Sequence, residues 1–467
     1  MKITFWGAAK NVTGSKHLIE SGGFNLLLDC GFYQGRRKDA NQQNRHLPFD
    51  AKNINAVILS HAHLDHCGSL PTLVKNGFAG KIYCTPATAE IAEYILLDSA
   101  NIQQHDCEYY NLHAAGRERI APIYGKEDVQ KVVERFETVD YFSSSGEWTK
   151  INENIRFKLY DAGHILGSAA ISLEIGENNE VKNLVFSGDL GRDELPILRA
   201  PEPMRESAQT LIMECTYGNR KHQPMPQVFG KVKDIVKTAV RKKSKIIVPA
   251  FSLGRTQELI YILHLLVKQR AIPKLPIYID TPLGDKITKI FPRYNHLFDK
   301  DFEREFGDDG KAAFNFNNLK YVQSTVESKS LNGKSGPFVV VAGSGMCEGG
   351  RILHHLKNGV GNAGNIVLIT GFQAENTLGR KILEGQSPVK IFGREYDVRA
   401  KITTLNELSA HADREGLLNY VKNFKELKNL FLVHTEPPQA EAFVGLVQKS
   451  LGGIAVNIPE FSQSFEI

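Results

Sequence analysis

The sequence lacks the features of a membrane-bound, secreted or fibrous protein. Its 467 residues contain no apolar run that approaches the roughly 18 consecutive residues of a membrane helix. The N-terminal stretch, MKITFWGAAKNVTGSKHLIE, also lacks the apolar core of a secretion signal. With 42% hydrophobic and 23% charged residues, the composition is that of a folded globular protein. We therefore expect a protein of the cytoplasm that does not contact the membrane.

Cysteine is scarce, and the net charge is small. The six cysteines form no CxxC pair and no dense framework, so we expect reduced thiols rather than disulfides. The 57 Lys and Arg against 52 Asp and Glu give a net charge of +5, which is too mild to identify a nucleic-acid-binding protein by itself. The function must therefore be inferred from motifs rather than from composition.

The order of the expected strands and helices indicates two kinds of architecture. Residues 1–206 are rich in short strands, with helices expected at 87–104 and 126–136. From 207 to 390 strands and helices alternate, which is typical of a parallel sheet with crossover helices. Residues 391–467 add a further succession of strands and helices. This organisation predicts several domains joined by short connections.

The strongest chemical signal is the segment SHAHLDHCG, residues 60–68, directly after the apolar strand AVIL. Four side chains that can bind a metal lie within six residues: His61, His63, Asp65 and His66. Their spacings of two, two and one do not fit one face of a helix, so we expect a loop that directs them at two centres. The alternative, a polar loop that happens to be rich in histidine, would leave three imidazoles in need of other partners.

Further ligands must come from elsewhere, because a zinc site needs three or four nitrogen, oxygen or sulfur ligands. Three polar residues follow apolar strands where a turn begins: His164 in YDAGHILGS, Asp189 in FSGDLG and His434 in FLVHTE. A carboxylate can bridge two cations, which makes Asp189 the natural shared ligand. Each of the three, taken alone, is equally well explained as an ordinary residue at a strand end.

Four motifs, taken in their order along the chain, resemble those of the metallo-β-lactamase fold: Asp29 in LLLDCG, the HxHxDH loop, AGHILGS and SGDLG. The later segments ECTYGNR, SAHAD and LVHTE, which contain Glu214, His411 and His434, are similar to the three additional motifs of the β-CASP subgroup. The likeness is to prokaryotic RNA nucleases of this subgroup, relatives of the endonuclease that cuts pre-mRNA before polyadenylation. One departure is Thr435, where these nucleases usually have glycine.

The resemblance implies an α/β fold in which residues 1–206 and 391–467 form an αββα metallo-β-lactamase sandwich. Residues 207–390 would form an inserted α/β β-CASP domain. The resemblance further implies a metal-dependent hydrolase with two Zn²⁺ ions per chain, although histidine and aspartate ligands would also suit iron or manganese. By this resemblance one zinc is held by His61, His63 and His164, the other by Asp65, His66 and His434, and Asp189 bridges them.

The expected reaction is hydrolysis of phosphodiester bonds in single-stranded RNA by a hydroxide that bridges the metals, in RNA processing or decay. Endonuclease action is expected, and exonuclease action is left open. The residues expected to act in catalysis are Asp65, Glu214 and His411, with His411 donating a proton to the leaving oxygen and Glu214 keeping it protonated. Asp29 would accept an imidazole N–H and so fix the direction of a ligand ring. Ordinary structural roles stay open for Asp29 and His411.

Three glycine-rich segments, PAFSLGRTQE, AGSGMCEGGR and GFQAENTLGR, each join an expected strand to an expected helix. Their backbone amides would point to where an anion lies, and an arginine near each helix start could clamp it. Phosphate is the anion that fits an RNA substrate. The residues predicted to contact RNA phosphates are Ser252, Arg255, Gly343, Ser344, Gly345, Arg351 and Arg380.

Three other functions remain as alternatives. A small-molecule hydrolase of the same fold would need only the first domain, so the inserted domain argues against it. DNA-directed β-CASP nucleases usually have an apolar residue at the last motif, where this chain has His434. An inactive scaffold would be expected to have lost ligands, and here each ligand position is filled. RNA is therefore the expected partner. Nothing precedes Met1 to supply the RNA-binding extension of some archaeal relatives, and two copies of the chain could pair as a homodimer.

Overall fold

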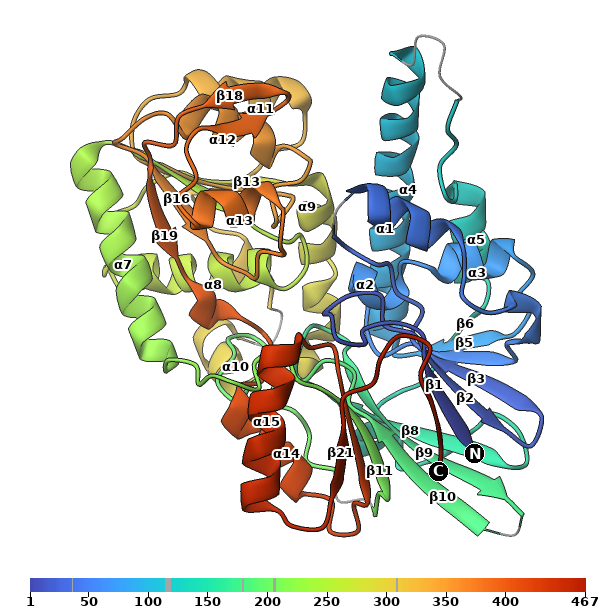
Figure 1. Ribbon diagram of the computed structural model, residues 1–467. Helices are drawn as coiled ribbons and strands as arrows, with labels where there is room; N and C mark the ends of the chain where they lie inside the picture. Colours follow the sequence, from blue (N-terminus) through green and yellow to red (C-terminus); the bar gives the residue numbers. More distant parts are fainter. Residues whose placement is uncertain (36, 114–118, 179, 205–206, 308–309) are drawn as a thin grey trace. The chain divides into compact units, whose positions relative to one another are not determined.

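The computed structural model describes residues 1–35, 37–113, 119–178, 180–204, 207–307 and 310–467 (Figure 1). The chain divides into two compact units. Unit 1 comprises Met1–Asp193, Arg199–Lys221 and His411–Ile467, and unit 2 comprises Glu194–Leu198 and His222–Ala410.

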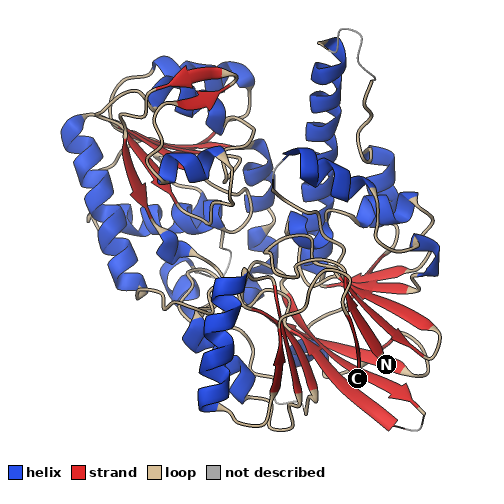
Figure 2. Cartoon of the chain, in the orientation of Figure 1, coloured by secondary structure: helices blue, strands red, loops and turns tan. Residues whose placement is uncertain are grey.

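Unit 1 contains two β-sheets that face each other (Figure 2). Between them, the rings of Phe5 and Phe431 lie 5.2 Å apart and those of Tyr83 and Phe157 5.3 Å apart. The first sheet has the order β22 (Ser464–Glu466), β1 (Lys2–Phe5), β2 (His17–Ser21), β3 (Phe24–Leu28), β4 (Ala56–Ile58), β5 (Lys81–Cys84) and β6 (Phe136–Thr138). The second has the order β21 (Ala455–Asn457), β20 (Asn429–Val433), β11 (Thr210–Glu214), β10 (Glu180–Phe186), β9 (Ala169–Glu177), β8 (Ile155–Asp161) and β7 (Thr149–Lys150).

Helices cover the outer sides of these sheets, which gives the αββα layering expected from the sequence (Figure 2). On the second sheet, Leu417 and Phe443 from two helices near the C-terminus pack into one apolar cluster with Leu211 and Leu430 of the strands. The helices of unit 1 are α1 (Arg37–Arg45), α2 (Leu64–Cys67), α3 (Leu70–Lys75), α4 (Pro86–Leu112), α5 (Lys126–Val133), α6 (Phe142–Ser145), α14 (Arg414–Lys422), α15 (Pro437–Ser450) and the 3-10 helix η1 (Ala51–Asn53).

Unit 2 is built on a parallel sheet whose four central strands are buried on both faces, as in other helix-covered parallel sheets, whereas its two edge strands are partly exposed. Its order is β14 (Leu319–Tyr321), β13 (Ile277–Asp280), β15 (Phe338–Ala342), β12 (Lys245–Pro249), β16 (Ile366–Ile369) and β19 (Lys401–Thr404). A hairpin of β17 (Val389–Ile391) and β18 (Arg394–Tyr396) stands beside it. The helices are α7 (Met225–Lys242), α8 (Arg255–Lys268), α9 (Pro282–Thr288), α10 (Lys300–Phe306), α11 (Thr325–Gly333), α12 (Ile352–Gly359), α13 (Leu378–Leu383), and the 3-10 helices η2 (Phe291–Leu297), η3 (Lys311–Phe314) and η4 (Asn406–Leu408).

The borders of the compact units lie at 221/222 and 410/411, whereas the sequence suggested 206/207 and 390/391. The difference arises because two strands pair with the sheet of the other unit than the one to which the sequence assigned them. β11, which begins the strand–helix alternation along the chain, pairs in parallel with β10 and β20 of unit 1. β19 pairs in parallel with β16 and so extends the sheet of unit 2.

No helix in the described part of the chain combines the length and the apolar character needed to cross a membrane.

Candidate metal centre

Four of the predicted ligands come from the segment of unit 1 that follows β4 and runs into α2. His61 and His63 lie in the loop, as expected, whereas Asp65 and His66 lie in the single turn of α2. Neighbouring residues on a helix point about 100° apart, so this turn sends the two side chains in different directions. Asp65 faces His434, with 3.4 Å between Oδ2 and Nε2, and His66 faces Asp29 and Asp189.

The first group of ligand atoms consists of His61, His63, His164 and Asp189. Nδ1 of His63 lies 3.1 Å from Nε2 of His61 and 3.2 Å from Nε2 of His164. Oδ2 of Asp189 lies 3.5 Å from each of the same two Nε2 atoms. Four potential ligand atoms thus surround one point.

The second group consists of Asp65, His66 and His434. It is connected to the first group by Asp189, whose other oxygen, Oδ1, lies 3.4 Å from Nε2 of His66. Each oxygen of the Asp189 carboxylate therefore faces a different group of ligands. This is the position that the sequence analysis gave to a bridging carboxylate.

The spacing of these atoms fits metal ions. A tetrahedron with metal–ligand bonds of about 2.0–2.1 Å has edges of about 3.3–3.4 Å, the contacts described above run from 3.1 to 3.5 Å, and all ligand atoms of a group lie within 4.8 Å of one another. Nε2 of His66 and Oδ1 of Asp189 are buried, and neither has a hydrogen-bond partner among the described residues. A cation would satisfy both atoms.

The ionisation of the first group also favours metal binding. Burial lowers the pKa of His61 and His164 well below the usual value, and burial lowers the pKa of His63 to about 4. A neutral imidazole offers a lone pair, which is the form that binds a metal. Burial raises the pKa of Asp189, but the nearby histidines outweigh it and hold that carboxylate ionised.

Asp29 orients histidines of both groups from behind. Its Oδ2 accepts a hydrogen bond from Nδ1 of His66 at 2.7 Å and from Oγ of Ser60 at 3.0 Å. The Ser60 hydroxyl in turn lies 3.0 Å from Nδ1 of His61. One buried carboxylate thus holds one ring directly and another through a serine, which leaves both Nε2 atoms aimed at the ligand groups. The sequence analysis included Asp29 but missed Ser60.

His411 and Glu214 meet at the edge of the first group. Nδ1 of His411 lies 2.9 and 3.1 Å from the two carboxylate oxygens of Glu214. The backbone N–H groups of Leu190 and Thr216 donate to that carboxylate and fix it. Burial lowers the pKa of His411, but Glu214 and Asp189 outweigh it and raise this pKa above the usual value. The arrangement favours a protonated imidazole whose Nδ1 is engaged.

Thr216 is a second residue that the sequence analysis missed. Its Oγ1 lies 3.0 Å from Nδ1 of His434 and donates to the His434 carbonyl oxygen at 3.1 Å. That geometry fixes the proton of His434 on Nδ1 and leaves Nε2 for a metal. Glu214 is the last residue of β11, and Thr216 lies in the turn that follows the strand, so the alternation of a strand could not have revealed Thr216.

The loop that carries His164 and the loop that carries Asp189 pack closely, with backbone against backbone. A Cβ on Gly191 would lie only 1.9 Å from the carbonyl oxygen of Gly163. The loop is also anchored at Gly167, whose carbonyl oxygen accepts hydrogen bonds from the hydroxyls of Thr85 and Thr88 at the start of α4. These contacts explain the glycines in AGHILGS and SGDLG.

The predicted phosphate-contacting residues lie in unit 2, at the carboxyl ends of neighbouring parallel strands. The chain leaves β12 towards β13 and leaves β15 towards β16, in opposite directions across the sheet, which is where open α/β sheets bind ligands. Ser252 follows β12, and its hydroxyl lies 2.8 Å from that of Thr281, which follows β13. Gly343, Ser344 and Gly345 follow β15, and the Ser344 hydroxyl accepts from backbone N–H groups of its own loop.

The three predicted arginine clamps are already engaged by carboxylates. Arg255 pairs with Glu258, and Arg380 donates to Glu384 at 2.6 Å. Arg351 donates to the buried carboxylate of Asp280, also at 2.6 Å. Arg351 is thus bound to a buried carboxylate, whereas Arg380 and Glu384 form an exposed pair at the C-terminal end of α13. The contacts of all three arginines with phosphate stay a prediction.

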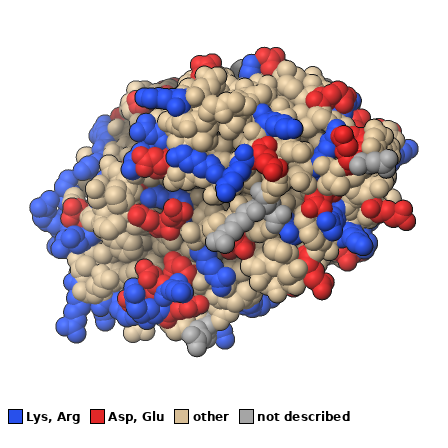
Figure 3. Space-filling model, turned by 90° about the horizontal axis from the view of Figure 1, so that it is seen from below, with Lys and Arg blue, Asp and Glu red and all other residues tan. Residues whose placement is uncertain are grey.

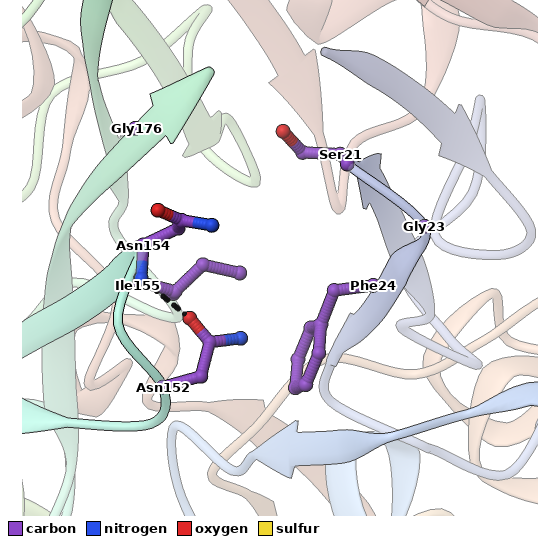
Figure 4. Close-up of a pocket in the computed structure, with 8 residues that line it drawn as sticks. Ser21, Gly23, Phe24, Asn152, Asn154, Ile155 and Gly176 are labelled. Carbon is purple, nitrogen blue, oxygen red and sulfur yellow. Dashed lines mark hydrogen bonds between the residues drawn. The ribbon is translucent and has the colours of Figure 1, made fainter. Parts of the chain in front are cut away.

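A hollow of about 160 Å³ in unit 1 lies between the turns Ser21–Phe24 and Asn152–Ile155 (Figure 4). Asn152 accepts hydrogen bonds from the backbone N–H groups of Asn154 and Ile155. Among the described residues that line the hollow, none carries an imidazole, a carboxylate or a thiol. The lining therefore offers no group that titrates near neutral pH and no nitrogen or sulfur ligand of the kind that binds zinc.

Three family models match the chain. The model of the metallo-beta-lactamase superfamily matches residues 13–250, the Beta-Casp domain matches 256–382, and the Zn-dependent metallo-hydrolase RNA specificity domain matches 395–459.

Curated relatives match over most of their length. The chain is 34% identical to ribonuclease TTHA0252 of Thermus thermophilus, over 100% of both chains. It is 29% identical to an RNase J-like protein of Methanocaldococcus jannaschii, over 96% of both chains. It is also 29% identical to the transcription termination factor FttA of that organism, over 96% of this chain and 69% of that protein. A solved protein of unknown function from Enterococcus faecalis shares the fold, with a TM-score of 0.53, 12% identity and 99% of each chain covered.

We expect Thr216→Val to weaken metal binding by about 10- to 100-fold, the usual effect of removing a hydrogen-bond partner of a metal ligand. Valine keeps the volume of threonine but cannot accept the Nδ1 proton of His434. Thr216→Ser, which keeps the hydroxyl, should retain metal as the unchanged protein does. Metal content after equilibration with a graded series of chelator concentrations checks this. Equal retention by the valine and serine variants would show that Thr216 does not act on His434.

Proposed function

Because the chain belongs to the metallo-beta-lactamase superfamily and carries a Beta-Casp domain, we propose that it is a metal-dependent ribonuclease that hydrolyses phosphodiester bonds of single-stranded RNA. The observation that carries the proposal is the meeting of two ligand groups at Asp189, with the Glu214–His411 pair beside them. The names of the relatives support RNA as the substrate, since ribonuclease TTHA0252 matches along its whole length.

Two Zn²⁺ ions per chain would complete this centre. His61, His63 and His164 would hold one, Asp65, His66 and His434 would hold the other, and Asp189 would contribute to both. The zinc-dependent description of the family model supports zinc over iron or manganese. When bound, such a metal pair supplies a nucleophile at neutral pH by lowering the pKa of water, and it neutralises charge on the phosphate.

His411 gives the leaving oxygen its proton. Nδ1 faces Glu214, so the transferred proton has to come from Nε2. Glu214 holds the ring in place and favours the protonated form. Asp65 would take part as a metal ligand. Its Oδ2 lies 3.4 Å from Nε2 of His434, a ligand of the same group.

RNA phosphates are contacted in unit 2 by Ser252 and the Gly343–Gly345 loop, with Thr281 as a further hydroxyl. Arg255, Arg351 and Arg380, which stand near the starts of the helices that follow these loops, are the arginines that would contact phosphate, and Arg351 is also bound to Asp280. The protein acts in the cytoplasm, where RNA is accessible and where its six buried thiols would stay reduced. The homodimer stays a prediction.

We expect single-stranded RNA to be cut and DNA of the same sequence to be cut poorly, because His434 fills the position at which DNA-directed relatives usually have an apolar residue. RNA labelled at the 5′ end and, separately, at the 3′ end measures the rate and distinguishes internal cuts from removal of terminal nucleotides. Equal rates on RNA and DNA would instead indicate a general nuclease, and the absence of cleavage with both metals bound would refute the proposed function.

His411→Ala should keep both metals and lose about 10²- to 10⁴-fold in the rate of RNA cleavage, the usual contribution of a general acid. The loss should be much smaller with bis(p-nitrophenyl) phosphate, because nitrophenolate leaves without needing a proton. Glu214→Gln should change both rates in the same direction as His411→Ala does. If His411→Ala releases a metal, His411 is a ligand and the assignment of His434 is wrong. Equal losses on both substrates would exclude proton donation by His411.

A further inference from the structure

The tip of the β17–β18 hairpin in unit 2 carries an unusual residue. Ile391 and Arg394 pair, so the loop consists of Phe392 and Gly393 alone, with φ angles of +50° and +76°. Two-residue turns of this kind strongly favour asparagine or glycine, because both positions need a left-handed backbone. A phenylalanine with positive φ is rare, and here its side chain is 54% exposed. Neither the turn nor the apolar core accounts for the choice of residue.

The ring of Phe392 is held by a histidine. His354 of α12 lies 4.8 Å from it, between ring centroids, at an interplanar angle of 40°. The two consecutive histidines of α12 have separate roles, because His355 turns inwards and contacts Asp280 at 2.6 Å. His354 therefore supports an aromatic ring at the surface, and the pair presents a fixed face to solvent.

Cations lie close to this pair of rings, and carboxylates lie among them. Lys357 lies one helical turn after His354 on α12, and the exposed Glu395 is the cross-strand partner of Lys390. Lys390 and Arg394 lie two residues before and after Phe392, and both are exposed. Figure 1 shows α11, α12 and β18 at one end of unit 2, and α12 contacts both α11 and β17.

An open hollow of about 780 Å³ lies between the C-terminal part of α12 and the strand side of the hairpin. Its lining includes Lys357 and Asn358 of α12 and Tyr396 of β18, and both cations and carboxylates border it, with Arg399 paired to Asp397. On the face of the molecule in Figure 3, basic and acidic side chains are likewise interspersed. Exposed aromatic rings beside cations are the combination that binds single-stranded nucleic acid, through base stacking and phosphate contacts.

We propose that Phe392, supported by His354, is a stacking platform for an unpaired base of RNA, with adjacent phosphates bound by Lys357, Lys390 and Arg394. The proposal rests on the proposed function and adds a contact to the RNA that none of the metal-binding residues makes. Stacking on one ring face discriminates little between bases, so the platform recognises unpaired RNA rather than a sequence. In a duplex the bases are stacked on one another and are not available to it.

The test compares three variants in a His411→Ala background, in which the RNA should stay whole. Fluorescence anisotropy with a labelled oligouridylate of about 16 nucleotides gives the dissociation constant. Phe392→Asn removes the ring and suits the turn, so the melting temperature should hold or rise while the dissociation constant increases about 5- to 100-fold, the loss of one stacked base. Phe392→Tyr should bind as the parent does. Phe461→Asn, which removes a phenylalanine 60% exposed in unit 1, should also leave binding unchanged.

The outcomes separate the platform from the proposed function. If the protein without these changes neither binds nor cuts RNA, the proposed function fails and the platform fails with it. If it binds and cuts RNA but Phe392→Asn binds as tightly as the parent, the platform alone is wrong. If Phe392→Asn leaves RNA binding unchanged and alters the sedimentation coefficient, the rings form a contact between protein copies, and the platform is likewise wrong.

Discussion

The buried carboxylate of Asp189 is the charge that the surrounding side chains of unit 1 compensate. It is 2% exposed, and its two oxygens face two different groups of histidine and aspartate ligands. An ionised carboxylate that is buried without compensation is strongly destabilising. The surrounding imidazoles, together with the metals they would bind, supply that compensation. The sheets and loops of unit 1 can be understood as the framework that brings these charges together.

The histidines around Asp189 are themselves held in place by further hydrogen bonds. Asp29 directs His66 by itself and His61 through Ser60. On the other side, Glu214 at the end of β11 and Thr216 in the turn after it hold His411 and His434. Hydrogen bonds of this kind decide which nitrogen of each ring carries a proton. A ligand set is therefore defined as much by the residues behind the rings as by the rings themselves.

Much of this could be predicted from the sequence, and the limits have physical causes. The family and the fold class predicted from the ordered motifs are confirmed by the family models. Local patterns pointed to the histidine loop and to Asp189, because such residues at strand ends stand out, and their role as metal ligands stays a prediction. Ser60 and Thr216 were missed, because only the three-dimensional structure shows which ring nitrogen each hydroxyl contacts.

Long-range pairing explains the other differences. The places of β11 and β19 depend on strands far away in the chain, which no local pattern encodes. The arginines of the glycine-rich segments looked available for phosphate, but the carboxylate that engages Arg351 comes from Asp280, on another strand. Phe392 gave no signal in the sequence, since only its backbone angle and its contact with His354 make it unusual.

X-ray absorption at the zinc edge tests the central claim, a metal pair bridged by Asp189, most directly. For the zinc-loaded protein the account predicts a metal–metal distance of about 3.5–4 Å, in addition to the shell of nitrogen and oxygen ligands. The same spectrum of Asp189→Ala should lack the metal–metal contribution. If the unchanged protein, with zinc present in excess, shows the shell of nitrogen and oxygen ligands but no metal–metal contribution, the claim of a metal pair is contradicted.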